Sequence, residues 1–442
     1  MTNKLIFLFS FLLSIQVSAQ DIPTSLSLQE AVDYAIKNNT SAKNALLDID
    51  AAIKQKWETT AIGLPQINAK VDYNNWLKQQ VNLIDFNGDG IDDEVVFGTS
   101  QTVNATATLS QLLFDGSYLV GLQSAKVFLE ISKNAKNKTD LEVRKNTINA
   151  YGNVLLSQES IAIYEKNIAI LEKSLREVTI TFENGLTEEE NVEQLQITLK
   201  QLNSGYKNAQ RLHQIAQQMF NITIGLEINS TVSLTESLEN LAQNNIDLAL
   251  LTSENDVQNT IDYKIAENDR RSKELLLKLQ KTKALPSLSA FVNGGYAANS
   301  NDFTFLDSDQ KWFGSSLFGV SLNVPIFSSG ERSAKTQRAK INLEKAENNL
   351  SETEKQLQFQ IASAKSNYQF AIDQFQTSKE NLALAERIER KNQTKFFEGI
   401  TSSFDLRQAQ QQLYTSQQEY LQAMLTVITE KVTLETLLNK TN

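Results

Sequence analysis

An internal duplication constrains the fold of this chain more than any other feature. Three landmarks recur in the same order, at offsets of 221, 213 and 214 residues. They are Leu64–Asn68 with Leu285–Ser289, Leu113–Gly116 with Ile326–Gly330, and Phe182–Thr187 with Phe397–Thr401. Nearly constant spacing across three landmarks predicts a tandem repeat of one structural unit. The drop in offset places about eight extra residues in the first copy, between its first two landmarks.

Each copy is predicted to contain a helix, two strands, a very long helix and a further helix. Proline is rare, and none falls within 117–181 or 331–396, where apolar residues recur at helical spacing. At about 1.5 Å per residue, each of these helices would be roughly 100 Å long. Such helices alone are equally typical of a soluble coiled coil.

Alternating apolar and polar residues predict four strands of about ten residues each. The apolar members begin at Ile67, Val103, Leu288 and Phe318. This length and alternation are typical of a membrane β-barrel, in which one face contacts lipid and the other water, although a soluble sandwich is the alternative. Four strands cannot close a barrel, which needs about eight, so several protomers would share one. The residues expected to face water are Asn68, Asn104, Ser321 and Asn323, and the aromatic residues near strand ends are Tyr73, Trp76, Tyr296, Trp312 and Phe313.

The N-terminus resembles a secretory signal peptide. Lys4 precedes the apolar stretch Leu5–Ile15, and Val17–Ala19 forms a small-residue cleavage site. The predicted organisation is therefore a signal peptide at 1–19, a first repeat at 20–220, an irregular connector at 221–254 and a second repeat at 255–442.

Composition argues against most enzyme chemistry. Cysteine is absent, which excludes thiolate metal sites and cysteine nucleophiles. The single histidine, His213, has no acid, serine or second histidine arranged beside it in the sequence, so a surface or packing role is expected. The net charge of −10 argues against a nucleic-acid partner, and no glycine-rich phosphate loop is present. We therefore expect no catalysis and no cofactor.

One loop carries a possible calcium motif. The oxygen-bearing residues Asp85, Asn87, Asp89 and Asp93 follow the spacing of a calcium loop. Val96 occupies the twelfth position, where a bidentate glutamate is needed. The sequence therefore favours a plain Asn-Gly and Asp-Gly turn over a metal site.

Taken together, these features resemble the TolC-like outer-membrane efflux proteins. The resemblance covers about Ser27 to Leu438 and includes Leu28–Asn39, the two Leu-Pro strand entries and Gly399–Leu406, of which the last segment is the most specific. It implies a mainly α protein with a membrane β-barrel portion. In that architecture a homotrimer shares one twelve-stranded barrel in outer-membrane lipid, and duplicated helical hairpins form a tunnel through the periplasm. The connector at 221–254 would contribute to a girdle around the tunnel.

The two hairpin turns are the predicted functional sites. Gly185 and Gly399 can adopt the positive φ that ends a helix, and Thr187 and Thr401 are expected to cap the helix that follows. The resemblance implies that a periplasmic adaptor docks on these turns, through Gly185, Leu186, Thr187, Gly399, Ile400 and Thr401. It also implies an entrance constriction formed by Asp405, its repeat partner Asn191, and Gln408. Since Asn191 and Gln408 are neutral, the acidic ring would be weaker than in members with two acids.

The predicted function is a passive export duct of a tripartite efflux system. Small molecules would be delivered by an inner-membrane transporter and a periplasmic adaptor and would leave through the outer membrane. The alternatives are the outer-membrane duct of a type I protein secretion system and a periplasmic coiled-coil adaptor or scaffold.

Overall fold

A computed structural model describes residues 24–85, 88, 90–253 and 256–440. The predicted signal peptide at 1–19 and the calcium candidates Asn87 and Asp89 lie outside the described residues. The described residues divide into two compact units: unit 1 consists of 24–42, 142–252 and 364–434, and unit 2 of 43–141, 253, 256–363 and 435–440, without the undescribed positions. Each unit takes segments from both halves of the sequence, so the units differ from the predicted repeats.

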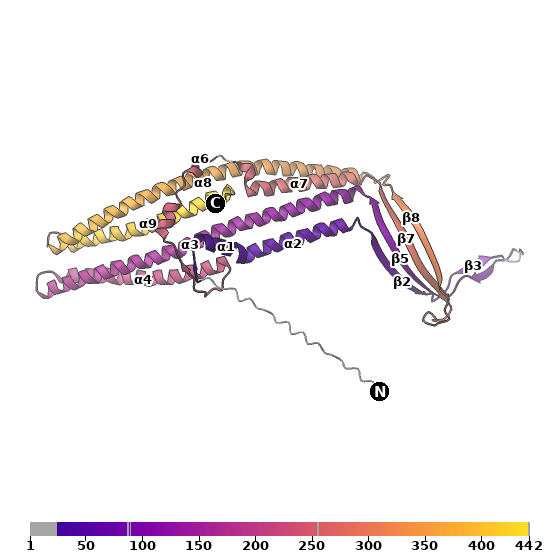
Figure 1. Cartoon of the computed structure of the whole chain (residues 1–442), viewed down its shortest axis with the longest axis horizontal. Helices are drawn as coiled ribbons and strands as arrows, with labels where there is room; N and C mark the ends of the chain where they lie inside the picture. The colour runs from indigo at the N-terminus through magenta and orange to yellow at the C-terminus, as the bar shows by residue number, and fades with distance from the viewer. Residues whose placement is uncertain (1–23, 86–87, 89, 254–255, 441–442) are drawn as a thin grey trace, which may run out of the picture. The chain divides into compact units, whose positions relative to one another are not determined.

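The same order of elements occurs twice along the chain (Figure 1). In the first half it is α2 (Thr40–Ala61), β2 (Gln66–Asn75), β5 (Gln101–Phe114), α3 (Gly116–Glu183) and α4 (Glu189–Ile224). In the second half it is α7 (Ile261–Thr282), β7 (Ser287–Ser300), β8 (Phe313–Asn323), α8 (Glu331–Phe397) and α9 (Ser403–Leu437). The long helices α3 and α8 contain 68 and 67 residues, as the absence of proline predicts. Among the described residues, no helix is both long enough and apolar enough to cross a membrane.

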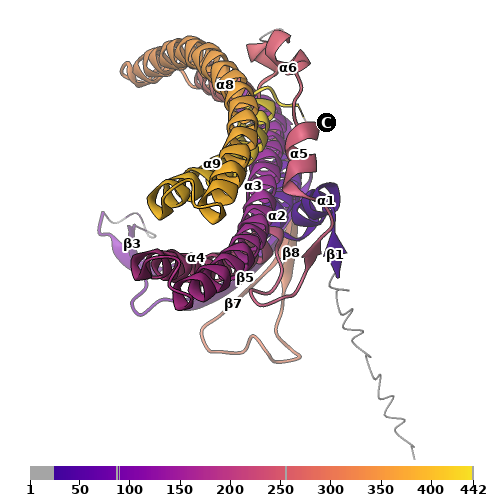
Figure 2. The same cartoon turned by 90° about the vertical axis from the view of Figure 1, so that its left-hand side faces the viewer.

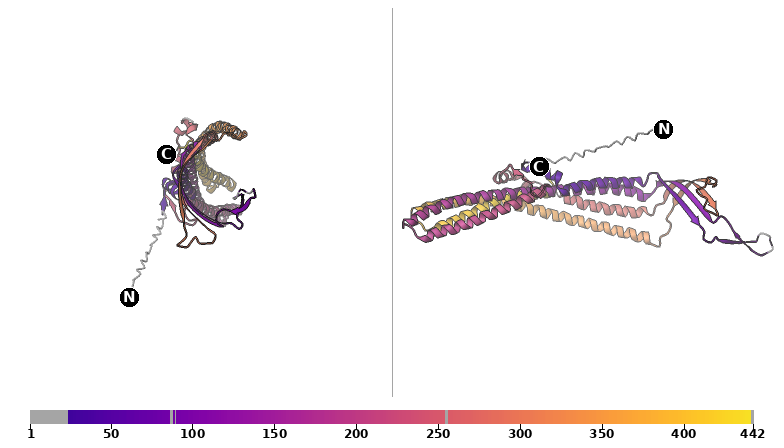
Figure 3. Two further views of the ribbon diagram at one scale, coloured as in Figure 1. Left: turned by 90° about the vertical axis from the view of Figure 1, so that its right-hand side faces the viewer. Right: turned by 90° about the horizontal axis from the view of Figure 1, so that it is seen from below.

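Unit 2 is built on one antiparallel sheet with the strand order β2-β5-β7-β8. The central pair, β5 and β7, joins strands from the two halves of the chain, and β2 and β8 are the edge strands. The first strand connection carries a further hairpin, β3 (Val81–Ile84) with β4 (Asp93–Val96), which projects beyond the sheet (Figures 1 and 3). The sheet therefore has helices at one end and this hairpin at the other.

The helices of unit 2 are held to one another by polar contacts. Tyr118 Oη on α3 donates a hydrogen bond to the carbonyl of Thr60 on α2 (3.1 Å). On the other side of α3, Lys138 Nζ lies 2.8 Å from Asp262 Oδ1 of α7, and Arg271 of α7 reaches Glu130 at 2.6 Å. These contacts align the helices that lead into and out of the sheet.

Unit 1 contains two helical hairpins, formed by α3 from residue 142 onward with α4 and by α8 from residue 364 onward with α9. Figure 2 views them from the ends where they turn. The α3–α4 hairpin is held by an apolar cluster of Leu171, Val178, Val192, Leu195 and Leu202. These residues recur at helical spacing on both helices, so each helix buries one stripe against the other.

The N-terminal helix α1 (Leu28–Asn38) docks on the C-terminal end of α4. Ser27 and Glu30 form a capping box that fixes where α1 begins. At the other end, Asn39 Nδ2 donates to the carbonyl of Thr223 (2.8 Å). Gly225, with φ of 86°, ends α4 against the backbone of Asn38. A left-handed glycine allows this close approach of two backbones.

The connector is anchored on the second hairpin of unit 1. It contains β6 (Ser233–Leu234), α5 (Leu238–Asn244) and α6 (Ala249–Thr252). The buried Tyr368 hydroxyl of α8 donates to the carbonyl of Asn245 (2.7 Å) and accepts from the N–H of Asp247 (2.8 Å). Lys431 of α9 adds a hydrogen bond to the Asn245 side chain (3.1 Å). One segment of the connector is thus tied to both helices of the hairpin.

Candidate functional site

One face of the sheet is apolar and exposed. The register aligns Ile67 with Leu109, Val292 and Phe318 across the four strands. Ile67 is 77% exposed and Phe318 is 68% exposed. Large side chains exposed in a continuous band are expected where a surface meets lipid or another apolar partner.

The opposite face is mainly polar. Asn68 aligns with Thr108 and Asn293, and the Thr108 hydroxyl donates to Asn293 Oδ1 (3.4 Å). All four residues predicted to face water lie on this face, according to the register: Asn68, Asn104, Ser321 and Asn323. The sheet therefore separates an apolar surface from one that can line an aqueous path.

The two hairpin turns have the same backbone geometry. Gly185 has φ of 72° and Gly399 has φ of 74°. In the first turn the N–H of Leu186 bonds to the carbonyl of Thr181, and the N–H of Ile400 makes the equivalent bond to Lys395 (3.0 and 2.8 Å). This six-to-one bond is that of a Schellman motif. In this turn geometry the side chains of Leu186 and Ile400 are exposed to solvent, by 78% and 68%.

The prediction that threonines cap the following helices is wrong. The N-cap of α4 is Glu188, which makes no side-chain capping bond. The residue before α9 is Ser402, whose Oγ accepts from the N–H of Asp405 (3.2 Å), while Asp405 Oδ2 accepts from the N–H of Ser402 (3.2 Å). This reciprocal pair of bonds is a capping box with an aspartate as its acid.

The two threonines instead bridge to the residues predicted to form the entrance constriction. The Thr401 hydroxyl donates to Asp405 Oδ2 (2.8 Å), and Thr187 Oγ1 accepts from Asn191 Nδ2 (2.8 Å). Hydrogen bonds from Ser402, and then from Thr401, hold the pKa of the exposed Asp405 carboxyl below its usual value. Gln408 is exposed on α9, three residues farther on.

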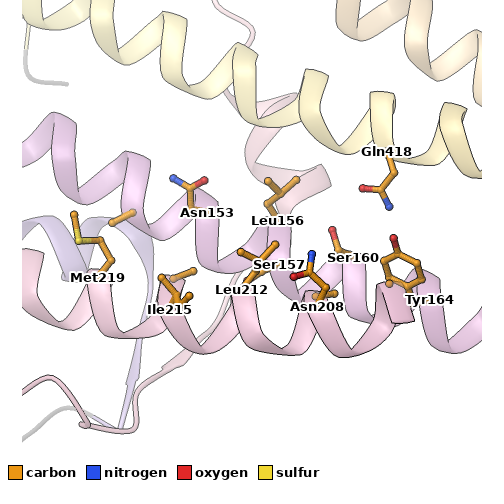
Figure 4. Close-up of a pocket in the computed structure, with 14 residues that line it drawn as sticks. Asn153, Leu156, Ser157, Ser160, Tyr164, Asn208, Leu212, Ile215, Met219 and Gln418 are labelled. Carbon is orange, nitrogen blue, oxygen red and sulfur yellow. The ribbon is translucent and has the colours of Figure 1, made fainter. Parts of the chain in front are cut away.

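A groove between α3 and α4 was not predicted from the sequence. Its volume is about 510 Å³, and its lining includes Tyr164, Leu212 and Met219 (Figure 4). Next to it, Ser157 Oγ lies 2.9 Å from Nδ1 of His213, and burial lowers the pKa of the imidazole. His213 thus packs beside Ser157, and among the described residues no acid is bonded to it. Small and apolar residues at helical spacing gave no signal of a groove, because the same pattern is typical of a helix interface.

The calcium candidates are described only in part. Asp85 Oδ1 accepts from the N–H of Gly88 (2.6 Å) and Oδ2 from the N–H of Gly90 (3.0 Å). Within the described residues, no group of three or more His, Asp or Glu side chains is placed to hold a metal ion. Both oxygens of Asp85 thus accept N–H groups of the turn.

Comparison with known proteins assigns the chain to a family. The model of the outer membrane efflux protein family matches residues 31–225 and 258–440, which is most of the chain. The chain belongs to this family. The predicted family, mainly helical fold, outer-membrane location and role in efflux are confirmed. Channels of this kind are transport proteins rather than enzymes.

The relatives of this outer membrane efflux protein include two from Pseudomonas putida. One is the toluene efflux pump outer membrane protein TtgC, and the other is the antibiotic efflux pump outer membrane protein ArpC. Each is 22% identical over 426 residues, covering 92% of this chain and 82% of the relative. The crystal structure of CusC has the same fold, with a TM-score of 0.75 and 17% identity over 95% of this chain and 94% of CusC.

Proposed function

We propose that three copies of this chain form one passive duct through the outer membrane. The observation that carries the proposal is the four-stranded sheet, which has two edge strands, β2 and β8, and two chemically different faces. Exposed strand edges are stable when they pair with another strand. Pairing β2 of one copy with β8 of the next would close a barrel, and three copies supply the twelve strands that the family resemblance implies.

In such a barrel the faces have separate tasks. The face with Ile67 and Phe318 contacts lipid, because burying exposed apolar side chains in the bilayer is favourable. The face with Asn68 and Asn293 lines the path, because its amides can bind water and polar solutes. The duct supplies a route, and the free energy for transport comes from an inner-membrane transporter.

Small molecules are the proposed cargo. The two Pseudomonas putida relatives are equally similar to this chain, yet one is named for toluene efflux and the other for antibiotic efflux. Equal similarity to ducts with different cargo names supports a general duct, with cargo chosen by the transporter.

Adaptor docking is proposed at the two hairpin turns. Leu186 and Ile400 are among the most exposed apolar side chains of unit 1, and they occupy equivalent positions in two turns of the same geometry. Exposed apolar residues at a rigid turn can anchor a protein partner. In cells, a photoreactive amino acid at Leu186 or Ile400 is expected to capture a periplasmic adaptor. The same probe at Ile341, an exposed position of α8 in unit 2, serves as the control. Capture from Ile341 alone would contradict docking at the turns.

Barrel closure can be tested by disulfide trapping, because the chain has no cysteine of its own. Val71→Cys on β2 is combined in turn with Phe318→Cys, Val320→Cys or Leu322→Cys on the same face of β8. Only the pair of positions that lie opposite each other between two copies should form a disulfide, because a disulfide needs Cβ atoms about 4 Å apart. After oxidation in the membrane, this pair is expected to give covalent dimers and trimers and no larger species. Val71→Cys with Ser321→Cys, on opposite faces, is the matched control. Only monomers for every pair, or cross-linked species of more than three copies, would contradict a closed trimeric barrel.

A further inference from the structure

A second cavity lies in unit 2, where the β3–β4 hairpin leaves the sheet. Its volume is about 380 Å³, within the range of about 300–1,000 Å³ typical of small-molecule pockets. Its lining comes from the hairpin, from the segments that join the hairpin to β2 and β5, and from the ends of β5 and β7. It includes Trp76, Gln80, Asn82, Phe97, Thr102 and Asn299. The β7–β8 connection at 301–312 contains no strand pair, so the cavity belongs to a hairpin that the second copy lacks.

The base of the hairpin is fixed to the sheet. The N–H of Trp76 donates to the carbonyl of Ser100 (2.8 Å), which extends the β2–β5 ladder. Ser100 is held in turn by the β7–β8 connection, because its N–H and its hydroxyl donate to the side chain and the carbonyl of Asn301 (3.1 and 2.8 Å). The walls of the cavity are therefore held by the sheet and by the neighbouring connection.

The lining has an unusual chemistry for a surface loop. No residue that the structure places in the lining carries a charge. Trp76 and Phe97 are 54% and 59% exposed, so neither ring is packed in a core. Within the part of the chain that the structure describes, the side-chain amides of Gln80, Asn82 and Asn299 make no hydrogen bond. Two exposed aromatic rings thus lie beside three side-chain amides that are free to bind a ligand.

The sheet residues that line the cavity lie on the polar face of the sheet. Thr102 aligns with Asn74 and Asn299 in the register, on the same face as Asn68. Trp76 extends this alternation by one step beyond Asn74, which places it on that face as well. A ring intended only to anchor the sheet in lipid would be expected on the opposite face.

We propose that this cavity binds a neutral saccharide. A sugar ring has an apolar C–H face, which packs on an aromatic ring, and a rim of hydroxyls, which amides bind as both donors and acceptors. A charged ligand would find no counter-ion in this lining. A purely apolar ligand would bury the amides without partners, which is costly. The proposal rests on residues of unit 2 alone and does not depend on trimer formation or adaptor docking.

The test is a fluorescence titration of the full mature protein in a detergent without a sugar headgroup, because glycosidic detergents carry the proposed ligand chemistry. Substituting Trp57→Phe and Trp312→Phe leaves Trp76 as the single tryptophan. The probes are the methyl glycosides of glucose, galactose, mannose and N-acetylglucosamine. We expect a saturable change in Trp76 emission with at least one of them, and no such change with sorbitol at equal concentration.

Variants in the same background decide whether the cavity is responsible. Gln80→Ala and Asn82→Ala are each expected to weaken binding about five- to tenfold, since each removes one hydrogen-bonding group. Asn323→Ala, on the same face of β8 but at the other end of the strand, is the matched control and should leave binding unchanged. A response that is absent, equal with sorbitol or insensitive to Asn82→Ala would overturn the proposal. So would quenching of Trp76 by brominated lipid in vesicles, which would indicate a membrane anchor.

A competition assay identifies the source of the sugar. Polysaccharide extracted from the envelope of the host cell displaces the methyl glycoside if the ligand is a surface glycan. If the polysaccharide does not displace the methyl glycoside, efflux of a fluorogenic glycoside is compared between cells that carry Asn82→Ala and wild-type cells. Altered efflux in the variant would indicate that the natural ligand is an exported glycoside.

Discussion

Gly225 offers a sharp test of how the N-terminal helix is held. A Cβ at this position would lie 2.5 Å from the carbonyl oxygen of Asn38 and 3.0 Å from the backbone N of Asn39. The left-handed φ of 86° costs a non-glycine residue about 1–2 kcal/mol. Displacing packed backbone to make room adds about 1–3 kcal/mol. We expect Gly225→Ala to destabilise the contact between α1 and α4 by about 2–5 kcal/mol.

Gly399→Ala is the matched control for Gly225→Ala. Its φ of 74° carries the same conformational cost, but apart from the glycine and its chain neighbours no atom of the described residues lies within 4 Å of the added Cβ. Its expected cost is therefore only about 1–2 kcal/mol, confined to the turn. Hydrogen exchange measured by mass spectrometry reports such local opening. At about 1.4 kcal/mol per tenfold change, Gly225→Ala should reduce the protection of α1 about 30-fold or more. Equal loss of local protection in the two variants would refute the argument from close backbone contact.

Three further predictions concern single side chains. Hydrogen bonds lower the pKa of the Asp405 carboxyl in the folded protein, so this carboxylate stabilises the start of α9 above pH 3.8, its ordinary pKa. The stabilisation is lost as the pH falls through the lower pKa of the folded state. Pepsin should therefore cleave the turn more readily as the pH falls through this range, and Asp405→Asn should remove the pH dependence. Burial lowers the pKa of His213, so stability is expected to fall as pH drops below 6.5, and melting temperatures at pH 7.5 and 5.5 should differ less in His213→Gln than in wild type. Arg332 donates to the carbonyls of Pro325 and Ile326 and to Ser328 (2.8, 3.1 and 3.1 Å), so Arg332→Lys should cost about 1.5–3 kcal/mol at the start of α8, seen as faster hydrogen exchange there.

Periodicity and proline spacing predicted most of the fold. The strands predicted from Ile67, Val103, Leu288 and Phe318 are all present, and both long helices end within two residues of the predicted positions. The order of the strands within the sheet could not be predicted, because alternation along β5 and β7 shows which side chains share a face but not which strands pair. The β3–β4 hairpin was also missed, since four residues per strand are too few to establish a period of two.

The candidate site was predicted less completely than the fold. The turn glycines follow from chain geometry, and both have the expected positive φ. The cap of α9 was misassigned because two hydroxyl residues adjoin the second turn, and the one that completes a reciprocal bond with Asp405 is Ser402 rather than Thr401. The saccharide cavity left no sequence signal, since its amides and rings are brought together by the sheet register and by the hairpin fold.

Comparison of the two turns separates the structural role of Asp405 from any role of its charge. Asn191 occupies the equivalent position and is bonded to Thr187 as Asp405 is to Thr401, although the Asn191 amide donates its bond and the Asp405 carboxylate accepts its bond. Because an asparagine side chain also has an oxygen that can accept the bonds made to Asp405, Asp405→Asn should keep the turn at neutral pH. In the proposed trimer the substitution removes three negative charges at one level of the tunnel. We expect lower cation selectivity in planar-bilayer recordings, because a ring of carboxylates favours cations. Glu398→Gln, a neutralised acid on the other side of the same turn, is the control. Unchanged selectivity in Asp405→Asn, with the turn intact by hydrogen exchange, would show that Asp405 serves the helix start and not the entrance.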